Sequence, residues 1–75
     1  MNRFFPGISI SPDVRFGKPC VAGTRVTAAE VLHWLAIGMS IEEIVDDFPY
    51  LSEEKIRQVL AYAANKESRY VIIAA

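Results

Sequence analysis

Basic and amide side chains are the groups of this chain best suited to binding chemistry. Lys55, Arg57 and Gln58 fall close together, and side chains of these types hydrogen-bond to base edges and phosphates of DNA. If this segment is helical, the three residues predict contact with operator DNA through its N-terminal part. Glu53 and Glu54 precede them and repel phosphate, so an ordinary packed helix with a solvated outer face remains the alternative.

A second set of basic residues lies in a segment rich in glycine and proline. Gly17-Lys18-Pro19 and Gly23-Thr24-Arg25 contain residue types found in phosphate-binding loops, but the GxxxxGK[ST] order is absent, so nucleotide binding is not expected. Glycine allows positive φ and proline fixes the backbone around it, which predicts turns. Arg15, Lys18 and Arg25 form a candidate DNA-binding cluster if two chains bring these segments together.

The remaining reactive residues do not form a catalytic or metal-binding pattern. His33 has no nucleophile or second ligand near it in the sequence, and Cys20 lies in an apolar setting typical of a small buried thiol. Asp46 and Asp47 are adjacent, so on a helix their side chains diverge by about 100° and cannot hold a metal by themselves. We expect no enzymatic activity, no metal and no cofactor.

Two capping boxes predict where the first two helices begin. Thr27 with Glu30 favours a helix from Ala28 to Ile37, and Gly38 is suited to end it in the left-handed conformation. Ser40 with Glu43 repeats the pattern and predicts a second helix that ends near Phe48, before Pro49. Its outer face carries four acids, which indicate either a solvated surface or a docking surface for a basic partner: Glu42, Glu43, Asp46 and Asp47.

Ser52 is placed to cap a third helix that runs to about Lys66 or Glu67. Each predicted helix has an apolar stripe at helical spacing, and the second and third helices are joined by a short turn, as in a helix-turn-helix. The expected fold is mainly α: a three-helix homeodomain-like or winged helix-turn-helix module with a short N-terminal strand at Ile8–Ile10 and a possible C-terminal strand. The stripes comprise Ala28, Val31, Leu32 and Leu35; Ile41, Ile44, Val45 and Phe48; and Ile56, Val59, Leu60 and Ala63.

The chain is expected to form one domain, with an N-terminal arm at 1–26, the three-helix core at 27–67 and an apolar tail at 68–75. The tail contains four strand-forming residues without charge, which are candidate partner-binding residues: Tyr70, Val71, Ile72 and Ile73. Three pairings remain open for this segment: with the strand at Ile8–Ile10, with the same segment of a second copy, or with the sheet edge of another protein.

Length and composition favour association with other chains. Hydrophobic residues make up 52% of the 75 residues, and a chain of this length buries only about 60% of its unfolded surface. One cysteine excludes an internal disulfide, so a homodimer is the expected source of additional stability. No apolar run approaches the roughly 18 residues of a membrane span, and the opening residues do not resemble a signal peptide, so we expect a cytoplasmic protein without membrane contact.

Charge is distributed unevenly. The net charge is −1, with an acidic middle between two basic ends. The overall balance therefore does not indicate a strongly basic nucleic-acid-binding protein, although either basic end can meet an acidic partner.

The motifs together resemble the family known as domain of unknown function 433. The likeness covers roughly Ile8 to Ala64 and is carried by a GKP and GTR pair followed by G-x-S-x-E-E-I: Ile10, Pro12, Phe16-Gly17-Lys18-Pro19, Val21, Gly23-Thr24-Arg25-Val26, Gly38-Met39-Ser40, Glu42-Glu43-Ile44, Phe48-Pro49, Leu51, Ile56 and Leu60-Ala61-Tyr62-Ala63.

This resemblance implies the antitoxin of a type II toxin–antitoxin pair, with a homeodomain-like or winged helix-turn-helix fold. Such an antitoxin is expected to bind and neutralise a PIN-like nuclease toxin and to bind its own operator DNA. The alternative is a helix-turn-helix transcriptional regulator without a toxin partner. In either case the family motif is expected at Gly17, Lys18, Pro19, Gly23, Thr24 and Arg25.

Overall fold

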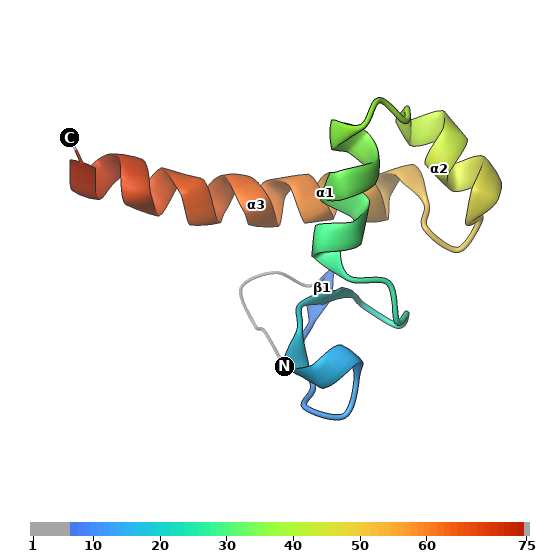
Figure 1. Ribbon diagram of the computed structural model, residues 1–75, viewed down its shortest axis with the longest axis horizontal. Coiled ribbons are helices and arrows are strands. Elements are labelled where there is room, and N and C mark those ends of the chain that lie inside the picture. Colours follow the sequence, from blue (N-terminus) through green and yellow to red (C-terminus); the bar gives the residue numbers. More distant parts are fainter. Residues whose placement is uncertain (1–6, 75) are drawn as a thin grey trace.

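The computed structural model describes the backbone of residues 7–74 and the side chains of residues 7–66. A small sheet and a tight turn precede three helices along the chain (Figure 1). The elements are β1 (Ile8–Ser9), the turn η1 (Arg15–Gly17), β2 (Cys20–Val21), α1 (Ala28–Ala36), α2 (Ile41–Asp47) and α3 (Glu53–Ala74). The chain is therefore mainly helical, as predicted, and residues 7–26 form the arm.

Both predicted capping boxes are present. At α1, the Thr27 hydroxyl accepts a hydrogen bond from the Glu30 backbone N–H at 3.0 Å, and Glu30 Oε1 accepts one from the Thr27 N–H at 2.9 Å. At α2, Ser40 and Glu43 make the same two bonds at 3.1 and 2.8 Å. These bonds satisfy amide groups that the first turn of a helix leaves unpaired, and so they fix where each helix begins.

The sheet consists of two short antiparallel strands within the arm. Ile8 pairs with Val21, and Ser9 pairs with Cys20. A further bridge joins Cys20 to Thr27, the residue that caps α1. The expected N-terminal strand is confirmed, and its partner is the β2 segment of the same arm. Pairing between this strand and the C-terminal tail, one of the three alternatives, is wrong.

The core lies where α3 meets the other elements, since α3 contacts α1, α2 and β1. Its buried side chains come from these elements, from β2 and from the turn before α3: Ile8, Val21, Ala28, Val31, Ile44, Leu51, Ile56 and Val59. Trp34 and Phe48 stack with ring centroids 4.9 Å apart and join α1 to the end of α2. Burial of these apolar stripes supplies most of the driving force for folding.

The C-terminal segment differs from the sequence-based expectation. We predicted that the third helix would end near Lys66 or Glu67 and that the tail would be extended, but α3 continues to Ala74. A strand needs a neighbouring strand for its backbone groups, whereas a helix pairs them internally and gains one bond with each added residue. No glycine or proline interrupts the sequence between Glu53 and Ala74. The side chains of Tyr70, Val71, Ile72 and Ile73 lie outside the described residues.

The winged form of the fold is not confirmed, because both strands that the structure describes, β1 and β2, precede the helices. One further expectation needs correction. Leu60, assigned to the inward stripe, is 39% exposed because it lies at the flank of the line formed by Ile56 and Val59. Among the described residues, no helix has the length and apolar character needed to cross a membrane.

Candidate protein-binding surfaces

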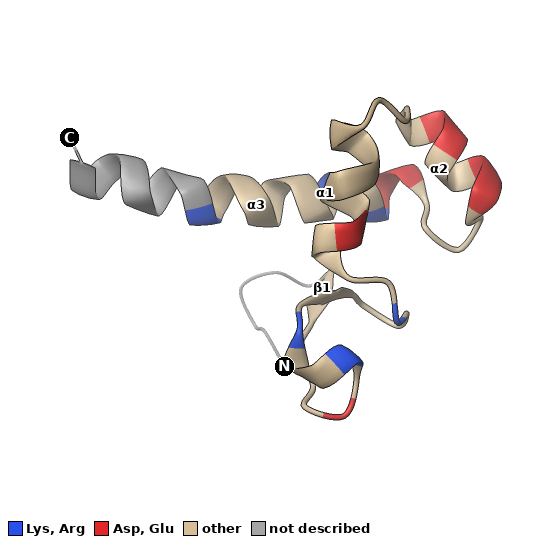
Figure 2. Cartoon of the chain, in the orientation of Figure 1, with Lys and Arg blue, Asp and Glu red and all other residues tan. Residues whose placement is uncertain are grey.

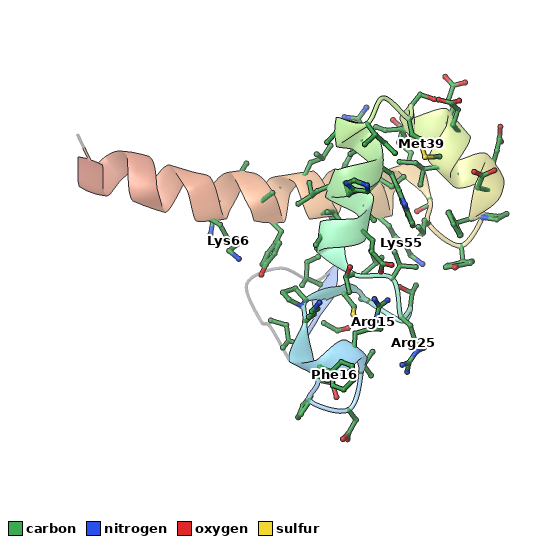
Figure 3. All side chains as sticks on the ribbon, viewed as in Figure 1. Arg15, Phe16, Arg25, Met39, Lys55 and Lys66 are labelled. Atoms are coloured by element: carbon green, nitrogen blue, oxygen red, sulfur yellow. The ribbon has the colours of Figure 1, made fainter. Side chains whose placement is uncertain are left out.

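The side chains expected to contact DNA lie together at the start of α3, and each already has a contact within the chain. Lys55 Nζ donates a hydrogen bond to the Tyr50 carbonyl oxygen at 3.0 Å (Figure 3). Arg57 donates two bonds to Glu53 Oε2, from Nη2 at 2.8 Å and from Nε at 3.0 Å. These contacts direct both cations toward acceptors of the same chain, and Arg57 is neutralised by its neighbour.

Gln58 is held against the first described residue of the arm. A Cβ atom added to Gly7 would lie 2.6 Å from Cδ and 2.8 Å from Cβ of Gln58, which is far inside van der Waals contact. Gln58 is accordingly half-buried, and only glycine fits at position 7 without movement of α3 or of the arm. The amide expected to contact a base edge thus packs against the arm.

The arm is tied to α1 through Arg15. Its Nη1 atom lies 2.9 Å from Oε1 of Glu30 and 2.9 Å from the carbonyl oxygen of Arg25. Because Glu30 also forms the capping box of α1, one carboxylate joins the arm to the beginning of the helix. Of the three basic residues expected to cluster, Arg15 is therefore a structural connection, and only Lys18 and Arg25 present exposed cations.

Hydrogen bonds hold Glu30 in its charged form. The backbone N–H of Thr27 makes the largest contribution to lowering the pKa of the Glu30 carboxyl below its ordinary value. Partial burial acts in the opposite direction, whereas the Thr27 hydroxyl and the Arg15 guanidinium lower the pKa further. Glu30 is thus an ionised anchor that both the helix cap and the arm use.

The remaining family-motif residues shape the arm. Gly17 and Gly23 adopt φ of +81° and +79°, which L side chains rarely take. The hydroxyl of Thr24 donates to the Val21 carbonyl at 2.9 Å and accepts from the Val26 N–H at 3.1 Å, closing a turn between β2 and α1. The Pro19 carbonyl accepts a hydrogen bond from the Ala28 N–H at 2.9 Å. The motif therefore has a structural role, which fixes the loop that carries Lys18 and Arg25.

Phe16 lies at the end of the arm with its side chain 95% exposed (Figure 3). Its backbone is left-handed, at φ 59° and ψ 33°, between Arg15 and Gly17, which also have positive φ. A left-handed conformation costs an L-residue about 1–2 kcal/mol. A ring that stays in water contributes no free energy of burial to offset this cost. The fold of the single chain therefore gives no account of a phenylalanine at this position.

A shallow groove of about 220 Å³ lies between α2 and the start of α3. Ile41 and Val45 supply its apolar lining, and the side chains of Glu42, Asp46 and Glu53 add three carboxylates. Glu53 is paired with Arg57, whereas neither Glu42 nor Asp46 has an ion-pair partner in the part of the chain that the structure describes. The groove thus combines apolar surface with uncompensated negative charge.

Opposite charges collect on different parts of the molecule (Figure 2). Acidic residues follow one another along α2, near the C-terminal end of α1, and basic residues lie along the arm, near the other end of α1. The two surfaces therefore have complementary electrostatic character without facing each other in one chain.

The residues considered for chemistry stay apart. Cys20 is buried, and its thiol donates a weak hydrogen bond to the Lys18 carbonyl at 3.4 Å, whereas His33 is exposed in the last turn of α1. Among the described residues, no three His, Cys, Asp or Glu side chains gather as a metal ion would require.

Two features of these surfaces were not foreseen from the sequence. Phe16 was treated as part of a motif, and nothing in a single sequence signals that an aromatic residue between Arg15 and Gly17 is exposed. Ile41 and Val45 were assigned to the core stripe, and they do pack against the core, but they also line the groove. Docking was one of two alternatives for the four acids of the second helix, and two of them, Glu42 and Asp46, line that groove.

Comparisons with other proteins place the chain in a family. Residues 8–63 match the family described as "Protein of unknown function (DUF433)". The chain is 41% identical over 56 residues to "Uncharacterized protein y4eO" of Sinorhizobium fredii (strain NBRC 101917 / NGR234). That match includes 75% of this chain and 25% of the relative, so the chain spans about a quarter of the relative's length.

A solved structure shares the fold. The crystal structure of a DUF433 member protein from Anabaena variabilis ATCC 29413 superposes with a TM-score of 0.74 and covers 92% of this chain and 69% of that one. At 24% sequence identity this likeness concerns the fold alone. The matched residues include both the GKP and GTR motifs, the helices α1 and α2 and the first part of α3, and the chain therefore belongs to the DUF433 family.

Proposed function

We propose that this chain is a protein-binding module that acts as the antitoxin of a type II toxin–antitoxin pair and neutralises a PIN-like nuclease toxin. The nature of the toxin rests on the family resemblance. The preference for a protein partner over DNA rests on the surface of α3.

The observation that carries the proposal is the state of the three side chains best suited to DNA. Lys55 is bonded to a carbonyl of its own chain, Arg57 is paired with Glu53, and Gln58 is half-buried against the arm. A helix that enters the major groove presents free cations and amides to base edges. The start of α3 instead presents acids and satisfied bases, which suits a protein partner better than a polyanion.

The C-terminal part of α3 offers a surface for such a partner. The helix extends well past the body of the molecule (Figure 1), and at about 1.5 Å per residue its 22 residues measure roughly 33 Å. Leu60 is 39% exposed at the point where the helix leaves the core. A projecting helix can lie in an apolar groove of another protein, a recognition mode that replaces the strand addition considered for the tail.

The experiment is a truncation measured in two ways. A stop codon after Lys66 removes the final part of α3 and leaves every fully buried core residue in place. We expect the shortened chain to keep cooperative unfolding but to lose rescue of cells that express the proposed PIN-like nuclease. Asp47→Lys, an exposed change on α2, is the matched control and should still rescue. If the shortened, folded chain neutralises as well as the full chain, the extension is not the toxin-binding surface.

A DNA-binding regulator without a toxin remains the second candidate, favoured by one observation. Lys18 and Arg25 are exposed and have no ion-pair partner among the described residues. Operator binding by this protein would then use the arm, with strong salt dependence, and would survive changes at the start of α3.

A further inference from the structure

We propose that two copies of this chain form a dimer with two reciprocal contacts. In each contact, Phe16 of one copy inserts into the groove between α2 and α3 of the other copy. The occupant of the groove is a second copy of the same chain. This association is separate from toxin binding, for which we propose the extension of α3.

The ring and the groove complement each other in size and chemistry. Phe16 projects from a tight turn and is 95% exposed, and the groove of about 220 Å³ has Ile41 and Val45 in its lining. A benzyl side chain fits in a space of this volume. Its insertion would remove apolar surface from water on both sides and would account for an aromatic residue on a strained backbone.

The charges around the two features have opposite signs. Lys18 and Arg25 are exposed on the same arm as Phe16, whereas Glu42 and Asp46 line the groove. In the described region none of these four side chains is engaged in an ion pair within its own chain. Bringing the arm to the groove would pair them at the rim of an apolar contact, the arrangement typical of specific interfaces.

The insertion of Phe16 into the groove requires a second chain. The end of the arm and α2 lie near opposite ends of α1, so Phe16 cannot reach the groove of its own copy (Figures 1 and 3). Because every copy carries both the ring and the groove, a two-fold arrangement forms the same contact twice. A second copy is therefore a sufficient occupant of the groove, since no other molecule has to supply the complementary residues.

Sedimentation velocity over a range of micromolar concentrations tests the contact. We expect a dimer whose dissociation constant increases at least roughly tenfold in Phe16→Ala, as for a central aromatic of an interface. Ile37→Ala, which alters another exposed apolar residue at 64% exposure, should leave the dissociation constant unchanged. A wild-type chain that stays monomeric overturns the proposal, as does a dimer weakened by Ile37→Ala and unaffected by Phe16→Ala.

Charge reversal supplies a second test that does not depend on the ring. The variant K18E/R25E has an acidic arm and an acidic groove, and the variant E42K/D46K has a basic arm and a basic groove. Each is expected to be monomeric alone, whereas an equimolar mixture forms a heterodimer in which both contacts are again complementary. All four residues are exposed, so folding should be retained, and circular dichroism checks it. Asp47→Lys, outside the groove, should dimerise as wild type. A mixture that remains monomeric contradicts the proposed dimer.

Discussion

Nη1 of Arg15 lies 2.9 Å from the same oxygen of Glu30 that accepts the backbone hydrogen bond of Thr27 at the start of α1. One carboxylate oxygen of Glu30 therefore joins the arm to the cap of α1. The stability of the arm and that of α1 are linked through this atom.

The first prediction concerns this link. Arg15→Ala should lower the free energy of unfolding by about 0.5–1 kcal/mol, because a partly exposed ion pair and a hydrogen bond to the Arg25 carbonyl are lost. Arg57→Ala removes the more exposed pair with Glu53 and should cost less than about 0.5 kcal/mol. Urea denaturation compares the two variants. Equal effects would show that the Arg15 contact adds nothing to an ordinary surface ion pair.

The second prediction is a dependence on acid. The pKa of Glu30 is lowered in the folded chain, so the stabilisation it provides is complete above its ordinary value of 4.5 and is lost as pH falls through the lowered folded-state pKa. Glu30→Gln should therefore lower stability near neutral pH and flatten its decrease below pH 4.5. Thermal unfolding at a series of pH values measures both. An unchanged acid slope in Glu30→Gln would assign the acid dependence to other carboxylates.

A third prediction separates stability from association at Phe16. Asparagine tolerates the left-handed region better than other L-residues, so Phe16→Asn should raise the free energy of unfolding of the dilute chain by up to about 1 kcal/mol. Phe16→Ala keeps the conformational cost and should be nearly neutral. Urea denaturation at low protein concentration makes the comparison. A loss of stability in Phe16→Asn would mean that the ring is held by its own chain.

The fourth prediction addresses DNA. The double variant K55A/R57A should have the same affinity for operator DNA as the wild-type chain, because both cations are engaged within the molecule. K18A/R25A should weaken any binding that occurs and should reduce its salt dependence. Fluorescence anisotropy with labelled duplex at several salt concentrations reports both quantities. A selective loss in K55A/R57A would restore the start of α3 as the DNA-contacting surface.

Local patterns were the most dependable guide to this fold. The boxes at Thr27 and Ser40 were predicted because a hydroxyl and a carboxylate three residues apart satisfy specific amide groups, and both helices begin where expected. Gly38 follows α1 with φ of +104°, as its position beyond the helix implied. The stripe residues Val31, Ile44, Ile56 and Val59 are all buried. Each of these predictions depends on neighbours within one or two helical turns.

Features that depend on contacts between distant parts of the sequence were harder to predict. The tail was expected to be extended from strand propensity, yet α3 continues through it, since propensity does not decide structure where a helix can simply be prolonged. The contact between Gln58 and Gly7, and the ion pair between Arg15 and Glu30, join segments that only the folded chain brings together. The exposure of Phe16 likewise follows from the left-handed turn and not from its residue type.

The proposal requires a PIN-like nuclease as partner, and the most direct test of the central claim is whether this chain inhibits such a nuclease. Purified nuclease is incubated with increasing amounts of the full chain, and RNA cleavage and heat of binding are recorded in parallel. Binding to a protein partner predicts saturable heat at a fixed molar ratio and loss of cleavage at that same ratio, with no requirement for DNA. Undiminished cleavage and no heat at micromolar concentrations, with both proteins folded, would contradict the assignment as an antitoxin.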